Sequence, residues 1–193
     1  DYVFDGASSI PYPEDAPTGP IGVYGKSKLA GELAIRAANP QHIIIRTAWL
    51  YGQYGKNFIT TMIKLARERD TLRVVRDQVG SPTWTRDLAA ATACVVARIL
   101  NTADPAAGLW GTYHYCGEGH TTWHELAKVA LDDAAQHEPL AVREIEPIET
   151  RDFPTPAIRP AFSVLSCDKV RVFGVYPRPW RESVAQFIEE LYA

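Results

Sequence analysis

Residues 40–52, with the sequence PQHIIIRTAWLYG, contain the pattern that decides the fold. Three consecutive β-branched residues, Ile43 to Ile45, lie between Pro40 and the Tyr51-Gly52 turn. A continuous apolar run of this kind predicts a strand that is buried on both faces of a parallel sheet. Tyr2 to Phe4 have the pattern expected at the end of another such strand.

Helix and loop patterns alternate with these strands along the chain. Residues 6–19 are rich in Gly, Ser and Pro and predict a loop, whereas Ile21 to Ala38 contain no interior proline and predict a helix. Strand, loop, helix and strand in this order indicate a βαβ unit. The same reasoning predicts helices at 58–69, 86–100 and 121–135, strands at 72–75 and 112–116, a turn at 80–82 and a loop at 101–108.

The composition of the sequence changes after Glu138, because seven of the 14 prolines follow that residue. We therefore expect a loop-rich region there, closed by an amphipathic helix over Arg181 to Tyr192. The whole pattern predicts an α/β fold. We expect the later part of a Rossmann-like doubly wound parallel sheet, with a smaller irregular α/β lobe.

Composition and charge are those of an ordinary globular protein. Among 193 residues, 20 basic and 23 acidic side chains leave a net charge of -3, and the 46% hydrophobic share is ample for a core. No apolar run approaches the ~18 residues of a membrane span and no polybasic stripe is present, so neither a membrane nor a nucleic-acid partner is expected. Cys94, Cys116 and Cys167 are odd in number and widely spaced, which favours reduced cysteines and a cytoplasmic location.

Tyr24 and Lys28 are the side chains that most directly suggest chemistry. They stand four residues apart on a predicted helix, so both project from one face. A nearby ammonium group favours the tyrosinate, and such a pair can pass a proton to a carbonyl oxygen while hydride reaches its carbon. The alternative is an exposed tyrosine and lysine on a solvated helix, and the spacing alone does not decide between the two.

Several motifs in a fixed order give this pair its context. They are Asp1-Tyr2-Val3-Phe4-Asp5-Gly6, Pro11-Tyr12-x-Glu14, Tyr24-x-x-x-Lys28 followed by Leu29-Ala30-Gly31-Glu32, Arg46-Thr47-Ala48-Trp49-Leu50-Tyr51-Gly52, Gly55-x-Asn57-Phe58, Asp77-Gln78-x-Gly80-x-Pro82-Thr83, and Arg159-Pro160 before Ser163-x-Leu165. Together, over nearly the whole chain, they resemble the dTDP-4-dehydrorhamnose reductase family of the extended short-chain dehydrogenases/reductases.

The resemblance implies an oxidoreductase of dTDP-rhamnose biosynthesis. With NADPH or NADH, such an enzyme reduces the C4 keto group of dTDP-4-dehydro-L-rhamnose to give dTDP-L-rhamnose. Tyr24 would protonate the C4 oxygen, and Lys28 would support Tyr24 and hydrogen-bond the nicotinamide ribose. Tyr2 and Trp49 match aromatic positions that line the sugar site in this family, with ordinary packing as the alternative for each.

Three further residues are expected to bind the dTDP-sugar. Gln78 and Thr83 lie in the turn into the substrate lobe and are expected to hydrogen-bond the sugar nucleotide. Arg159 is expected to bind the diphosphate, because a guanidinium holds phosphate oxygens in a bidentate way; an exposed arginine in a proline-rich loop is the alternative. Arg46, at the end of the strand 43–45, is expected to form a structural ion pair, with a ligand contact as the alternative.

Two parts of the family pattern do not occur in the sequence. The family's catalytic serine or threonine would lie immediately before Asp1, and no glycine-rich turn for a dinucleotide pyrophosphate is found. The chain opens within a strand pattern, and its only methionine is Met62. We therefore expect the carboxyl-terminal part of such a reductase, truncated and inactive alone.

The resemblance also predicts an organisation and an association. Residues 1–70 and 85–117 are expected to form the remainder of the cofactor domain, and residues 71–84 and 118–193 the sugar-nucleotide lobe. The strand 43–45 would pair with 112–116 on one side and with Tyr2 to Phe4 on the other. The outer edge of Tyr2 to Phe4 would then be unpaired and apolar, which predicts a homo-oligomer through that sheet edge.

Other groupings suggest less. Cys116, His120 and His124 lack a fourth ligand at a standard spacing, so no metal site is predicted. Trp123 is expected to be a packing residue. Two alternative functions stay open: a non-catalytic regulatory subunit with the same fold, and a reductase or epimerase for another nucleotide sugar.

Overall fold

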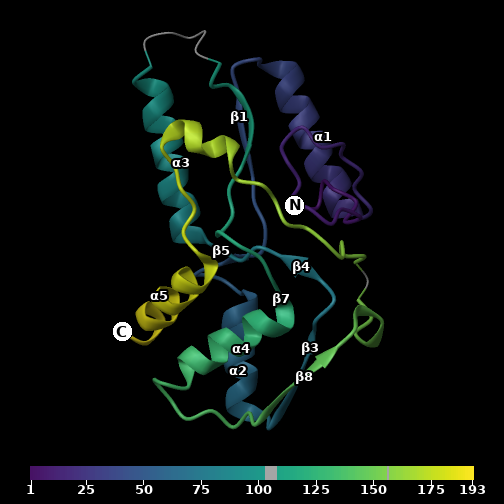
Figure 1. Ribbon diagram of the computed structural model, residues 1–193, viewed down its shortest axis with the longest axis vertical. Helices are drawn as coiled ribbons and strands as arrows, with labels where there is room; N and C mark the ends of the chain where they lie inside the picture. The colour runs from purple at the N-terminus through teal and green to yellow at the C-terminus, as the bar shows by residue number, and fades with distance from the viewer. Residues whose placement is uncertain (103–107, 156) are drawn as a thin grey trace.

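The computed structural model describes residues 1–102, 108–155 and 157–193 (Figure 1). Its helices are α1 (Val23–Ala38), α2 (Phe58–Glu68), α3 (Thr85–Leu100), α4 (Trp123–Ala134) and α5 (Trp180–Tyr192), with two 3-10 turns, η1 (Thr150–Asp152) and η2 (Lys169–Phe173). Each predicted helix is confirmed to within two residues at either end. Of the predicted loop 101–108, residues 103–107 lie outside the described residues. In the described ranges, no helix combines the length and the hydropathy needed to cross a bilayer.

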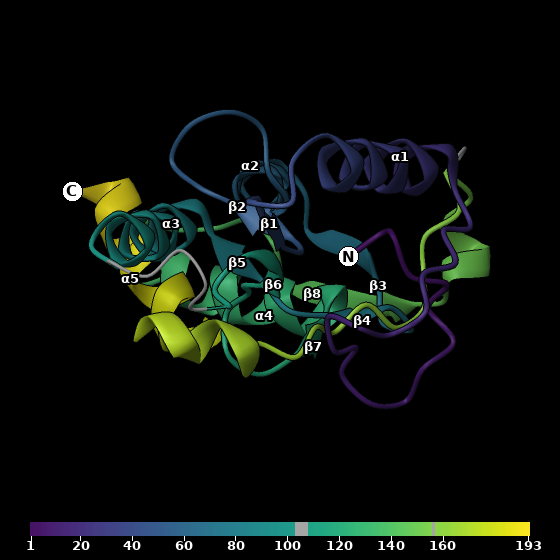
Figure 2. The same cartoon turned by 90° about the horizontal axis from the view of Figure 1, so that it is seen from above.

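The apolar run that opened the analysis forms β1 (Ile43–Arg46), which pairs in parallel with β6 (Gly111–His114). The strand prediction is confirmed, and so is one of its two predicted partners, the strand at 112–116. The two strands lie between α3 and α1 (Figures 1 and 2). α3 covers them with Ala91 and Val95, which pack in one cluster with Tyr113.

The predicted strand at Tyr2 to Phe4 is wrong. These residues form a turn in which the Phe4 N–H donates to the Asp1 carbonyl oxygen at 3.1 Å. Burial of the side chains determines this conformation: Phe4 is fully buried, and its ring stacks on Tyr12 with centroids 4.3 Å apart. The apolar edge expected there is therefore absent from the described structure, and a homo-oligomer remains a prediction without that basis.

A second hydrophobic cluster lies beside β3 (Thr71–Val75) and β8 (Glu144–Ile148), which pair in parallel. α2, α4 and α5 supply most of its side chains, and these three helices gather beside the two strands in Figure 1. β8 lies within the region predicted to be loop-rich, so that prediction is wrong for these residues. Pro147 hid the strand, because proline is depleted in strands and is tolerated at sheet edges.

Two short strand pairs bring the motif segments together. β2 (Leu50–Tyr51) runs parallel to β5 (Thr83–Trp84), and β4 (Val79–Gly80) is antiparallel to β7 (Thr121–Thr122). Trp123 begins α4 directly after β7, and the Thr122 side chain caps that helix by accepting from the Glu125 N–H. The segment after β1, residues 78–83 and the start of α4 therefore meet. The proposed division into a cofactor domain and a lobe stays a prediction.

Candidate functional site

An open cavity of about 550 Å³ is lined by four of the seven residues that the sequence nominated. They are Tyr2, Tyr24, Trp49 and Arg159, and they come from the amino-terminal turn, α1, the turn between β1 and β2, and the loop before residue 160. The wall of the cavity combines these aromatic rings with charged and polar side chains, among them Lys56, Asn57 and Thr61.

The Tyr24 and Lys28 side chains lie together on the exposed face of α1. The Lys28 Nζ is 5.1 Å from the centre of the Tyr24 ring, and the Tyr2 ring meets that ring edge-on with centroids 5.5 Å apart. Tyr24 is 60% exposed, so its hydroxyl is accessible from the cavity. The spacing that predicted this pair thus corresponds to a real proximity in the fold.

Gly25 allows α1 to approach the amino-terminal turn this closely. A Cβ atom at this position would lie 2.0 Å from the Tyr2 carbonyl oxygen, far inside van der Waals contact. The glycine between Tyr24 and Lys28 therefore determines how near the Tyr24 ring comes to Tyr2.

Trp49 has a left-handed backbone, with φ of 46°, in the turn between β1 and β2. Among the described residues it is the only non-glycine with positive φ, a conformation that costs on the order of 1–3 kcal/mol and is concentrated at functional sites. Its indole stacks on Trp123, with ring centroids 3.5 Å apart and planes inclined by 7°. Trp49 contacts the hydrophobic core and also lines the cavity, and its contact with a sugar stays a prediction.

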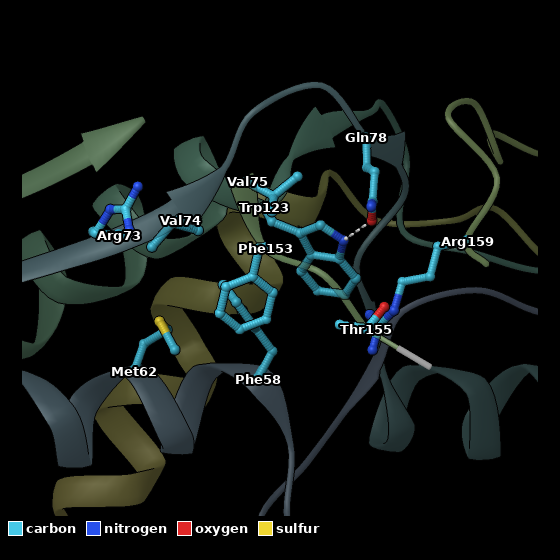
Figure 3. Close-up of a pocket in the computed structure, with 10 residues that line it drawn as sticks. All are labelled: Phe58, Met62, Arg73, Val74, Val75, Gln78, Trp123, Phe153, Thr155 and Arg159. Atoms are coloured by element: carbon cyan, nitrogen blue, oxygen red, sulfur yellow. Dashed lines mark hydrogen bonds between the residues drawn. The ribbon is translucent and has the colours of Figure 1, made fainter. Parts of the chain in front are cut away.

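A smaller cavity of about 180 Å³ is shown in Figure 3, and it shares three lining residues with the first. Its walls are mainly apolar, with Phe58 and Met62 from α2, Val74 from β3 and Phe153 after η1. Phe58, Trp123 and Arg159 line both cavities. Arg159 is therefore the one cationic residue, within the described chain, that borders both spaces.

Gln78 lines the smaller cavity and Thr83 lines neither. The Gln78 Oε1 accepts from the Trp123 indole N–H at 3.1 Å, and its Nε2 donates to the Thr150 hydroxyl at 3.0 Å. Thr83 is fully buried, and its hydroxyl donates to the Ser81 carbonyl oxygen at 3.3 Å. Contacts of these two residues with a sugar nucleotide stay predictions.

Arg46 forms the structural ion pair that the sequence favoured. Its Nε and Nη2 donate to the two carboxylate oxygens of Glu32 at 2.8 and 2.7 Å, and both residues are buried. Such a bidentate pair satisfies two charges that would be costly to bury separately. It joins α1 to the end of β1 and thereby fixes the helix that carries Tyr24.

His114 completes this buried network as a neutral ring. Burial, reinforced by the Arg46 guanidinium, lowers the pKa of His114 to about 3. Its Nε2 lies 3.3 Å from Arg46 Nη1 and its Nδ1 lies 3.2 Å from the Ser166 carbonyl oxygen. A ring protonated on Nδ1 accepts from Arg46 and donates to Ser166, so both contacts are satisfied.

The sequence analysis did not identify three residues that line the cavities. Lys56 and Phe58 line the large cavity beside the α2 N-cap, and Trp123 separates the two cavities. Lys56 follows a glycine in an exposed turn, and no sequence pattern identifies it as a site residue.

In the part of the chain that the structure describes, no three His, Cys, Asp or Glu side chains are grouped as metal ligands require.

The family model described as the RmlD substrate-binding domain matches residues 1–193. The chain belongs to the RmlD substrate-binding domain family. A relative in this family comparison, the dTDP-4-dehydrorhamnose reductase of Sinorhizobium fredii, is 43% identical over 191 residues, which cover 97% of this chain and 63% of that protein.

Solved structures agree with the assignment to the RmlD family. A dTDP-4-dehydrorhamnose reductase from Clostridium acetobutylicum is 37% identical, with a TM-score of 0.88 over 100% of this chain and 64% of its own. That of Bacillus anthracis, in complex with NADP, is 36% identical, with a TM-score of 0.86 over 98% and 63%. The α/β Rossmann-like fold predicted from the sequence is thereby confirmed. This chain spans less than two thirds of the length of these relatives.

Proposed function

We propose that this RmlD-family domain supplies the sugar-nucleotide site and the proton donor of a dTDP-4-dehydrorhamnose reductase. The observation that supports it most is the shared cavity: Tyr24, with Lys28 beside it, faces the same 550 Å³ space as Trp49 and Arg159. The reaction would convert the C4 keto group of dTDP-4-dehydro-L-rhamnose into the C4 hydroxyl of dTDP-L-rhamnose.

Tyr24 is the proton donor in this proposal. Its hydroxyl gives its proton to the C4 oxygen as negative charge develops there, and solvent access lets the phenol be reprotonated afterwards. The ammonium group of Lys28 stabilises the tyrosinate that remains. Tyr2, edge-on to Tyr24, limits how the Tyr24 ring can turn and so directs the hydroxyl.

Tyr24 and Lys28 are also the residues of this chain that would hold the nicotinamide cofactor. Both are exposed on the same face of α1, and a hydroxyl and an ammonium group suit the hydroxyls of a ribose. When bound, NADPH or NADH supplies the hydride that adds to C4. The glycine-rich turn that would bind the pyrophosphate is not found in the sequence.

The two cavities and Arg159 can accommodate the base, the diphosphate and the sugar of a dTDP-sugar in the order in which these groups are linked. The apolar 180 Å³ space has room for a pyrimidine ring and offers apolar contacts to the thymine methyl group. Arg159, which borders both spaces, suits the diphosphate between base and sugar. The deoxyhexose would then lie against Trp49, near Tyr24.

Calorimetry on the 193-residue chain tests the ligand assignment. We expect dTDP-L-rhamnose to bind, and Arg159→Gln to weaken it about tenfold or more, the effect of losing a charge-assisted hydrogen bond. Arg151→Gln is the matched control, because Arg151 is exposed in the same region and lines neither cavity. A GDP-sugar that binds as tightly as dTDP-L-rhamnose, or an Arg159→Gln variant that binds like the control, would contradict the proposal.

A cytoplasmic location, a homo-oligomer and inactivity of the 193 residues alone stay predictions. The three cysteines are free, which is compatible with a reducing compartment.

A further inference from the structure

The left-handed backbone of Trp49 is held by a neighbouring segment. The Thr83 N–H donates to the Trp49 carbonyl oxygen at 3.1 Å, across the start of the β2 and β5 pair. A sparsely populated conformation persists only where the surrounding structure over-determines it. This hydrogen bond fixes the main chain of Trp49 but leaves the indole to be placed by other contacts.

Gly80 places one edge of the indole. A Cβ atom at Gly80 would lie 2.3 Å from Trp49 Cε2, 2.5 Å from Nε1 and 2.7 Å from Cζ2. All three atoms belong to the indole, so any side chain at residue 80 would displace it. Gly80 itself lines neither cavity, so it acts on the large cavity through this contact.

Trp123 places the face of the indole, and its own ring is fixed by a hydrogen-bonded chain. Its indole N–H donates to Gln78, Gln78 donates to the Thr150 hydroxyl, and that hydroxyl donates to an Asp77 carboxylate oxygen at 2.7 Å. Each side chain in this series of hydrogen bonds is held by the next one. These hydrogen bonds, which end at Asp77, fix the orientation of the Trp123 ring. The Trp49 indole stacks on that ring, so its orientation is fixed as well.

We propose that Gln78, Gly80 and Thr83 are positioning residues, which hold Trp49 as a fixed wall of the sugar site. Gln78 acts through Trp123, Gly80 through the space that it leaves, and Thr83 through its backbone N–H. This inference rests on the proposed function, because it takes the space beside Trp49 to be the sugar site. It gives the motif from Asp77 to Thr83 a role that needs no direct contact with the ligand.

Gly80→Ala tests the proposal with two ligands that differ only in the sugar. In the 193-residue chain, we expect the affinity for dTDP-L-rhamnose to fall about tenfold or more, while the affinity for dTDP stays within about twofold of the unsubstituted chain. Gly31→Ala is the control, because a Cβ atom there meets nothing within 4 Å. Equal losses for both ligands, or no loss for either, would overturn the proposal.

Circular dichroism supplies a readout that does not depend on the ligand. Two indoles stacked at 3.5 Å should give an exciton couplet in the far-ultraviolet spectrum. We expect the couplet to be lost in Gly80→Ala and kept in Gly31→Ala. A couplet that survives in folded Gly80→Ala would overturn the assignment of Gly80. A wild-type chain that shows the couplet but binds neither ligand would contradict the proposed function and leave the positioning geometry supported.

Thr150 provides a second pair of variants in case Gly80→Ala does not fold. Thr150→Val removes the hydroxyl that supports Gln78, whereas Thr150→Ser keeps it, and Thr150 lines neither cavity. We expect Thr150→Val to lose affinity for dTDP-L-rhamnose and Thr150→Ser to keep it. Identical behaviour of the two variants would count against the hydrogen-bonded chain.

Discussion

At Tyr24, removal of one oxygen atom should separate binding from chemistry. Tyr24→Phe keeps the aromatic wall of the cavity, so we expect dTDP-L-rhamnose affinity to change little. Turnover should fall ~100-fold or more, the scale expected when a positioned acid is lost. NADPH oxidation is measured in a hybrid that joins residues 1–193 to the part of the Sinorhizobium fredii reductase outside the similarity.

Tyr54→Phe is the matched control for this experiment, because Tyr54 is 90% exposed and lies outside the large cavity. Its turnover should equal that of the unsubstituted hybrid. Near-normal turnover of Tyr24→Phe would remove Tyr24 from the role of proton donor.

The indole of Trp49 should report sugar binding directly. We expect dTDP-L-rhamnose to quench the tryptophan fluorescence of the chain, and Trp49→Phe to abolish most of that quenching, because the sugar would lie against this ring. Trp110→Phe serves as control, since Trp110 lines neither cavity. Quenching of normal amplitude in Trp49→Phe would show that the ligand lies elsewhere.

Among the structural elements, α1 depends on the absence of a side chain at residue 25. Gly25→Ala would drive a Cβ atom into the Tyr2 carbonyl oxygen, 2.0 Å away, so α1 must shift outward. We expect the free energy of unfolding to fall by about 1–3 kcal/mol, the cost of overpacking. Urea denaturation of the 193-residue chain measures it.

Gly31→Ala, on the same helix, has open space around the added methyl group. It should be neutral or stabilise the chain by up to about 1 kcal/mol, the helix propensity difference between glycine and alanine. Equal effects of the two substitutions would mean that α1 does not pack on the amino-terminal turn as described.

The elements also show which features were predictable from the sequence. The helices and β1 follow periodic or continuous apolar patterns, and such patterns depend on neighbours along the chain. The turn at Tyr2 to Phe4 depends on the ring of Tyr12 and the distant Arg46, which no local pattern contains. β8 was missed for a different reason, because Pro147 contradicts the usual composition of a strand.

The site residues likewise include some that local sequence patterns predict and others that depend on distant contacts. Tyr24 and Lys28 are neighbours on one helix turn, so their spacing carried the prediction. The stack of Trp49 on Trp123 joins positions 74 residues apart, and the two residues are brought together by the β2–β5 and β4–β7 pairs. A tryptophan that separates two cavities has the same sequence signature as one that fills a core.

Over the whole molecule, the buried network around His114 should make stability depend on pH. The pKa of His114 is about 3 in the folded state, against 6.5 for an ordinary histidine in the unfolded chain. Between these values the unfolded state binds more protons, so stability decreases as pH falls from about 6.5 toward 3. This one group contributes at most about 1.4 kcal/mol per pH unit.

Urea denaturation at a series of pH values tests this contribution. His114→Gln should be less stable at pH 7, because a buried hydrogen-bonded ring is lost, yet its stability should depend less on pH between 6 and 4. Burial raises the pKa of the neighbouring Glu14, whose effect is common to both proteins and cancels in the comparison. His120→Gln, at an exposed position, should parallel the wild type. Parallel curves for His114→Gln as well would assign the pH dependence to other groups.

Pro147 in β8 affects how folded molecules associate with one another at high concentration. The main-chain groups of Ile148 face β3, since its carbonyl oxygen accepts from the Arg76 N–H at 2.9 Å, so those of Pro147 and Ile145 face outward. Pro147 has no N–H to offer there, and the Ile145 carbonyl oxygen lies 2.9 Å from His124 Nε2. An incoming strand would find one donor position missing and one acceptor already occupied. This edge is therefore a poor template for fibril growth, and the same proline that obscured the strand protects it from aggregation.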